Sequence, residues 1–146
     1  MPLRDSRPIV GDESQQLVLV IEDSPGLSRS IGLLCDYLGI RLETVSGRSD
    51  LKALLRAKRP MAVMSPVDTP AQDGCHVLKT IAAYDRDLPV LLVTGTDPVV
   101  LGAVEAVEEI WQLSQVQKAT ANPSFGDFAE FLSKAGRRSG GGLMAA

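Results

Sequence analysis

Residues 17–25 read LVLVIEDSP: five apolar residues, two acids, and then a serine and a proline. An unbroken apolar run of this length is typical of a strand that is buried on both faces of a parallel sheet. Ser24 suits the N-cap of a following helix, with Pro25 at the first helical position. The stretch therefore predicts a central strand that passes directly into a helix.

The alternation of an apolar run with a helical pattern continues along the chain. Apolar residues recur at Leu27, Ile31, Leu34 and Leu38, the spacing of one helix face, and Gly39 is placed to end that helix. A helical pattern also follows each of the further predicted strands, at 40–45, 61–65, 88–94 and within 113–119. Five such units predict an α/β fold of three layers, a doubly wound (βα)5 parallel sheet with helices on both faces.

Length and composition agree with one folded domain. The chain has 146 residues, 45% of them hydrophobic, and a net charge of −3. We expect the domain over 17–134, a disordered segment over 1–16, and a flexible Gly-rich tail or the start of a linker over 135–146.

No apolar stretch suits a membrane span or a secretion signal, so we expect a cytoplasmic protein with no membrane partner. Cationic residues do not cluster and only 4% of residues are aromatic, so we expect no nucleic-acid partner.

In a doubly wound sheet the functional crevice lies at the carboxyl ends of the strands. The residues expected there are Glu22 and Asp23 after the first strand, Pro66 and Asp68 at the end of the third, and Thr94 at the end of the fourth. Three carboxylates close together repel one another, and a cation would relieve that repulsion. These side chains are the candidates for a functional site.

The layout resembles the receiver domain of response regulators in two-component systems. The likeness is carried by LVLVIEDSP, by RPMAVMSPVDTPAQDG at 59–74, by LPVLLVTG at 88–95 and by ANPSF at 121–125. It covers nearly all of 17–134. The resemblance implies a flavodoxin-like sheet with strand order 2-1-3-4-5, and a signalling domain rather than an enzyme.

The chemistry of that family is the transfer of a phosphoryl group from a histidine kinase to an aspartate at the end of the third strand. The reaction uses a carboxylate nucleophile, a divalent cation held by an acidic pair, and a hydroxyl and a lysine that bind phosphate oxygens. By the resemblance, Glu22 and Asp23 match the acidic pair and Thr94 matches the hydroxyl residue. These three parts of the family site are present.

Three other parts of the family site are replaced. The acceptor position falls on Pro66, the lysine position on Asn122, and the position of the aromatic residue that reports activation on Ala119. Proline has no side-chain acceptor, so phosphotransfer to position 66 is impossible. The resemblance then implies a pseudo-receiver, a protein-interaction module that works without its own phosphorylation. Its expected partner is a sensor kinase, an output domain or a second copy, bound through the fourth helix, the fifth strand and the fifth helix, with Trp111 on that face.

Alternatives remain open on the sequence alone. A shifted register would make Asp68 the acceptor and bring Lys118 to the lysine position, at the cost of a proline inside a buried strand. The vacated crevice could instead bind a small molecule or a nucleotide, although no Gly-rich phosphate loop opens a helix in this chain. Glu22 and Asp23 either bind Mg²⁺ weakly or merely help to start the first helix. The interaction module itself requires no cofactor.

Overall fold

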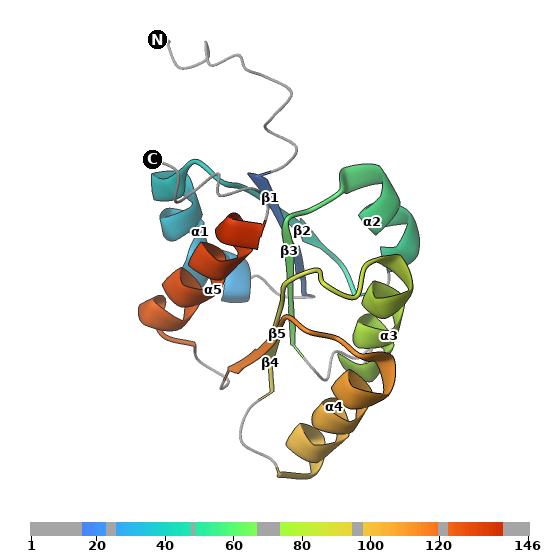
Figure 1. Ribbon diagram of the computed structural model, residues 1–146. Helices are drawn as coiled ribbons and strands as arrows, with labels where there is room; N and C mark the ends of the chain where they lie inside the picture. The colour runs from blue at the N-terminus through green and yellow to red at the C-terminus, as the bar shows by residue number, and fades with distance from the viewer. Residues whose placement is uncertain are drawn as a thin grey trace, which may run out of the picture.

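A computed structural model describes residues 16–22, 26–47, 49–66, 74–94, 98–119 and 123–138. Five parallel strands form one sheet in the order β2-β1-β3-β4-β5, which confirms the predicted topology. Strands and helices alternate along the chain (Figure 1): β1 (Leu17–Ile21), α1 (Gly26–Leu38), β2 (Arg41–Val45), α2 (Leu51–Lys58), β3 (Ala62–Pro66), α3 (Gly74–Tyr84), β4 (Val90–Val93), α4 (Pro98–Trp111), β5 (Val116–Ala119) and α5 (Phe125–Arg138).

The sequence pattern of each strand matches its place in the sheet. All five residues of β1 are buried, because β1 pairs with β2 on one side and with β3 on the other. The more polar β2 lies at one edge, where Arg41 and Thr44 are exposed. The short β5 lies at the opposite edge and pairs with β4 alone.

The helices form one layer on each face of the sheet. Helices α1 and α5 lie on one face, and α2, α3 and α4 lie on the other (Figure 1). Alternate residues of β1 serve the two sides: Val18 and Val20 pack toward α1 and α5, whereas Leu19 and Ile21 pack toward α2, α3 and α4. The protein therefore has two apolar cores separated by the sheet.

One helix and one strand end beyond their predicted boundaries. Helix α5 continues to Arg138, past the boundary expected at 134, because Ala135 is fully buried in the core beneath α1 and α5. Pro66 is the last residue of β3, one residue beyond the predicted strand, and lies opposite Val93 of β4. Gly39 ends α1 with a φ of 74°, as its position in the sequence predicts.

The longest helices, α4 and α5, have 14 residues each. Helix α5 carries several charged side chains along its outer face, such as Glu130 and Lys134. Within the described ranges, no helix is long and apolar enough to cross a membrane.

Candidate functional site

The carboxyl ends of three neighbouring strands meet at one edge of the sheet. Glu22 follows β1, Pro66 ends β3 and Thr94 follows β4, and the pairing of β3 with both β1 and β4 brings the three positions into one crevice. Three other candidates, Asp23, Asp68 and Asn122, lie outside the described residues. The structure therefore describes three of the five residues that were expected in the crevice.

Glu22 is a buried carboxylate that caps α1. Its Oε1 accepts a hydrogen bond from the backbone N–H of Leu27 at 2.8 Å, and its Oε2 accepts one from the N–H of Ser28 at 2.9 Å. The first amides of a helix have no partner within the helix, and a negative charge near them is favourable. The predicted N-cap, Ser24, lies outside the described residues. Glu22 thus helps to start α1, which is one of the two roles that the sequence leaves open for the acidic pair.

Replacement of Glu22 by alanine should destabilise the protein. The Glu22→Ala variant leaves two amides of α1 without their acceptors, and the free energy of unfolding should fall by about 1–2 kcal/mol, the usual cost of a lost helix cap. Urea denaturation followed by circular dichroism measures this loss. The matched control is Glu105→Ala on the exposed surface of α4, for which a change under about 0.5 kcal/mol is expected.

The same measurement separates capping from metal binding at Glu22. If Glu22 acts through its cap, the loss is equal in EDTA and in Mg²⁺. A loss that appears only in Mg²⁺ would assign Glu22 to a cation instead, and equal stability of the two alanine variants would contradict the cap. Among the described residues, no three His, Cys, Asp or Glu side chains gather into a metal-binding group.

At Pro66, β3 is still paired with β4 but is no longer paired with β1. The ladder between β1 and β3 ends at Met64, whereas the ladder with β4 includes Pro66 itself. A residue without an N–H is tolerated at such a position and not in the middle of a sheet. Its neighbour Ser65 is fully buried, and the Ser65 hydroxyl donates to the carbonyl oxygen of Pro66 at 2.8 Å.

Thr94 is buried and tied to β5. Its N–H donates to the carbonyl oxygen of Ala119 at 2.8 Å, and its Oγ1 donates to the same oxygen at 3.3 Å. Ala119 is buried as well and packs in the core under α1 and α5. The hydroxyl and the alanine that the resemblance associates with switching are thus in direct contact.

Lys118 is held by α4. Its Nζ lies 2.6 Å from Oε2 of Glu108, and both side chains are partly buried. Lys118 pairs in register with Leu92 of β4, and alternate residues of β5 belong to opposite faces of the sheet. Val116 packs on the α4 side and Ala119 on the α5 side, so Lys118 belongs to the α4 side. The lysine in the shifted reading is therefore already engaged in an ion pair that joins α4 to β5.

Trp111 is half-buried at the end of α4. Its side chain packs against the core beneath α2, α3 and α4 and borders a cavity of about 610 Å³ together with Ala82 and Arg86. The indole therefore lies on the side of α4 that faces α3. Trp111 is therefore partly covered, and exposed apolar residues of α4 are more accessible probes of an interaction face.

Cys35 offers no nucleophile under ordinary conditions. Burial, with a smaller contribution from the Asp36 carboxylate, raises the pKa of the Cys35 thiol to about 11. The thiol is therefore protonated at neutral pH, and only the thiolate is a strong nucleophile.

The sequence is similar to those of response regulators. The family model for the response regulator receiver domain matches residues 18–116. The C4-dicarboxylate transport transcriptional regulatory protein DctD of Pseudomonas aeruginosa is 32% identical over 100 residues, which cover 68% of this chain and 21% of that protein. The probable transcriptional regulatory protein TcrX of Mycobacterium tuberculosis is 34% identical over 82 residues, or 56% of this chain and 35% of that protein. The chain thus spans only a fifth to about a third of these relatives.

Solved structures share the fold. A response regulator receiver protein from Pseudomonas putida aligns with a TM-score of 0.64 and 24% identity, covering 82% of this chain and 97% of that one. The chemotaxis protein CheY4 of Vibrio cholerae aligns with a TM-score of 0.65 and 18% identity, covering 83% and 98%. At these identities the likeness concerns the fold.

Proposed function

Because the chain belongs to the response regulator receiver family, we propose that it is a cytoplasmic, non-enzymatic module of two-component signalling that binds a protein partner without being phosphorylated. The observation that carries this proposal is Pro66 at the end of β3. The family has its acceptor aspartate at the end of the third strand, and a proline side chain offers no oxygen to a phosphoryl group.

The contacts of Thr94 support the same proposal. In a receiver that switches, a charge at the acceptor position draws the hydroxyl residue toward it, and an aromatic side chain follows. In this chain the Thr94 hydroxyl donates to Ala119, and alanine has no side chain that could swing. The sequence also has Asn122 where the family has its charged lysine. In this proposal, a structural change in the crevice is therefore not transmitted to the outer surface of the domain.

The ion pair between Glu108 and Lys118 supports a fixed arrangement of α4 against β5. The two charged groups are 2.6 Å apart and partly buried, so solvent screens their attraction less than that of a fully exposed pair. A surface that includes α4 and β5 is therefore presented in one conformation. A module without a switch is useful when that single conformation binds a partner.

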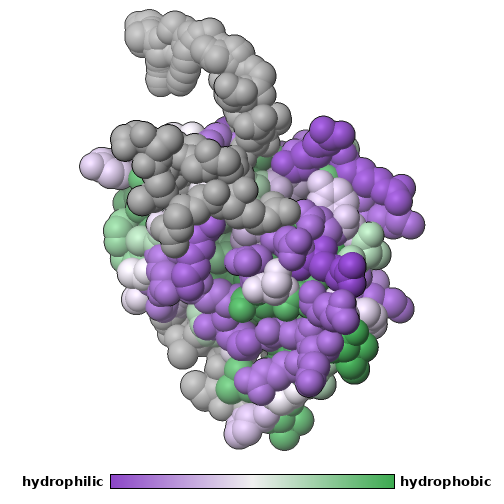
Figure 2. Space-filling view, in the orientation of Figure 1, coloured by the Kyte–Doolittle hydropathy of each residue, from purple (hydrophilic) through white to green (hydrophobic). Residues whose placement is uncertain are grey.

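Helix α4 carries the apolar side chains that such a partner would contact. Val99 is 79% exposed, and Ile110, which also borders the cavity beside α3, is 70% exposed. Figure 2 shows hydrophobic surface among hydrophilic side chains at the lower right, where Figure 1 places α4. The proposed partner is a sensor kinase, an output domain or a second copy of this chain.

Charged substitutions on α4 should weaken association. For Val99→Asp and Ile110→Asp we expect a loss of about 2 kcal/mol each, roughly a 30-fold loss of affinity, which is the usual effect at a hot spot of an interface. Analytical ultracentrifugation measures self-association, and titration measures binding to a kinase or output domain that affinity capture identifies.

Thr94→Val is the control for the crevice. This variant removes the hydroxyl and preserves the shape of the side chain, and it should bind the partner as the native chain does. If Thr94→Val abolishes binding while the fold is intact and the α4 variants bind normally, the crevice is the working site and the proposed module is wrong.

A further inference from the structure

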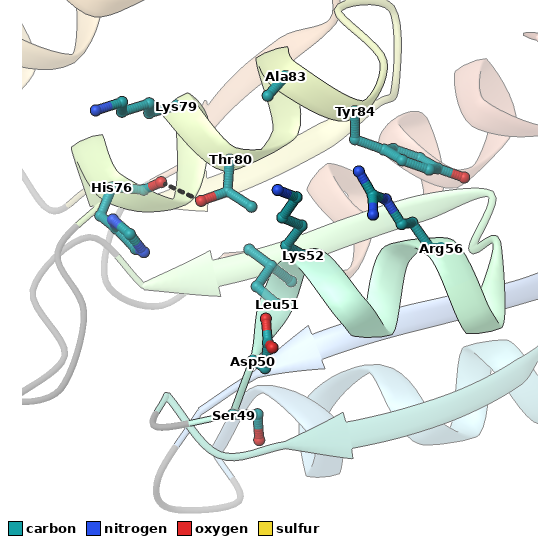
Figure 3. Close-up of a pocket in the computed structure, with 10 residues that line it drawn as sticks. All are labelled: Ser49, Asp50, Leu51, Lys52, Arg56, His76, Lys79, Thr80, Ala83 and Tyr84. Carbon is teal, nitrogen blue, oxygen red and sulfur yellow. Dashed lines mark hydrogen bonds between the residues drawn. The ribbon is translucent and has the colours of Figure 1, made fainter.

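A cavity of about 580 Å³ lies between α2 and α3, and Glu22, Pro66 and Thr94 of the crevice are not among its lining residues. Figure 3 shows Lys52 and Arg56 reaching from α2 toward α3, where Thr80 and Tyr84 lie. The volume is in the usual range for small-molecule sites, roughly 300–1,000 Å³. Nothing in the proposed protein-interaction role uses this cavity.

The walls of this α2–α3 cavity are strongly cationic, although the whole chain has a net charge of −3. Lys52, Arg56 and Lys79 line it, and His76 lies at one end. The carboxylate among the lining residues is Asp50, whose Oδ1 accepts a hydrogen bond from the N–H of Ala53. None of the three basic side chains forms an ion pair with a residue that the structure describes.

The two basic residues on α2 repel each other when no ligand lies between them. Lys52 and Arg56 are four residues apart, so their side chains are neighbours on one face of the helix, and like charges at this spacing destabilise a helix. An anion between them would turn this repulsion into attraction. Arginine offers a planar fork of donors that matches phosphate, and lysine supplies a compact charge.

The cavity also has an apolar part. Leu51 is buried at its base, and Ala83 and the ring of Tyr84 belong to the α3 wall. Figure 3 shows the Tyr84 ring beside Arg56, so an aromatic surface and a cation are adjacent. Apolar walls with a few charged groups are typical of sites that bind an organic ligand rather than a bare ion.

We infer that the α2–α3 cavity binds a small ligand with phosphate groups on an apolar or aromatic body, of the size of a nucleotide. Lys52 and Arg56 hold the phosphate groups from α2, whereas Lys79 extends from α3 away from these two side chains (Figure 3). Tyr84 contacts the body of the ligand. This site uses residues other than Glu22, Pro66 and Thr94, so the inference can succeed or fail independently of the proposed protein-interaction role.

Isothermal titration calorimetry of the full chain with ATP, and separately with inorganic pyrophosphate, tests the inference. Both titrations are made without divalent cations, which would compete for the phosphate groups. We expect saturable binding of one ATP per chain, weakened by added salt because exposed charges are screened. Tighter binding of ATP than of pyrophosphate would support the contact between Tyr84 and the body of the ligand, and equal binding would contradict that contact.

Two double variants with the same change of charge locate the site. Lys52→Gln with Arg56→Gln should weaken ATP binding roughly tenfold or more, the equivalent of about 1.4 kcal/mol. Arg29→Gln with Lys134→Gln removes two exposed cations from α1 and α5, on the other face of the sheet, and should leave the affinity within about twofold. Thermal melting verifies that both variants are folded. Equal weakening in the two variants, or no saturable binding of either probe by the native chain at millimolar concentration, would overturn the inference.

Discussion

Incubated with acetyl phosphate and Mg²⁺, the native chain should gain no phosphoryl group. The crevice has Pro66 at the end of β3, and Thr94, the one hydroxyl residue matched to the family site, already donates to Ala119. An aspartyl phosphate needs a carboxylate at the attacking position. Mass spectrometry of the intact chain measures the result, and lability toward hydroxylamine identifies an acyl phosphate.

Two substitutions should produce a variant that does accept a phosphoryl group. Pro66→Asp with Asn122→Lys restores both the carboxylate and the cation that the family uses, and this double variant should gain one phosphoryl group. If the double variant also stays unmodified, the correspondence between Pro66 and the acceptor position is wrong. A phosphoryl group on the native chain that disappears in Asp68→Asn would establish the shifted reading and contradict the proposed function.

Removal of the Phe128 ring should destabilise the protein far more than the loss of the Glu22 cap. Phe128 is only 1% exposed and packs in the core between the sheet and helices α1 and α5. Phe128→Ala should reduce the free energy of unfolding by about 3–5 kcal/mol, because it removes apolar contacts and leaves a cavity. A domain has about 5–15 kcal/mol in total, so the variant should unfold at a much lower urea concentration.

Phe125→Ala is the matched control, since it is the same substitution in the same helix. Phe125 is the first residue of α5 and is 61% exposed, so the change should be under about 0.5 kcal/mol. Equal losses in the two variants would mean that α5 does not pack as the structure describes. The sequence spacing alone could not separate these two rings, because burial depends on where the helix begins relative to the sheet.

The order of the strands and helices was predictable because each apolar run is short, is bounded by a turn signal and is followed by a helical pattern. The LVLVI run of β1 predicts burial on both faces, and β1 is buried throughout. The mixed polar pattern of β2 is the pattern of an edge strand, and β2 lies at an edge. These signals are present in the local sequence because a strand that is covered on both faces has apolar residues throughout, whereas an exposed face has polar residues.

The contacts within the site were less predictable. Whether Glu22 would cap α1 or hold a cation depends on the direction of its side chain, which spacing does not determine. The Glu108–Lys118 pair joins residues ten apart in two different elements, and Trp111 turns toward α3 through packing alone. The α2–α3 cavity had one signal in the sequence, the like charges of Lys52 and Arg56 at helical spacing, but its second wall comes from the tertiary fold.

The edges of the sheet limit how two copies of this chain can join. An exposed edge strand with free N–H and C=O groups is a template for pairing with another sheet, and natural proteins block it with short strands and charged side chains. At one edge, β2 carries Arg41 and Glu43, and Glu43 pairs with Lys58 of α2 at 3.0 Å. At the other edge, β5 has four residues, among them Lys118. Growth of a continuous sheet from one molecule into the next is therefore disfavoured, which protects the protein from β-type aggregation and leaves contacts between helices as the route to a specific dimer.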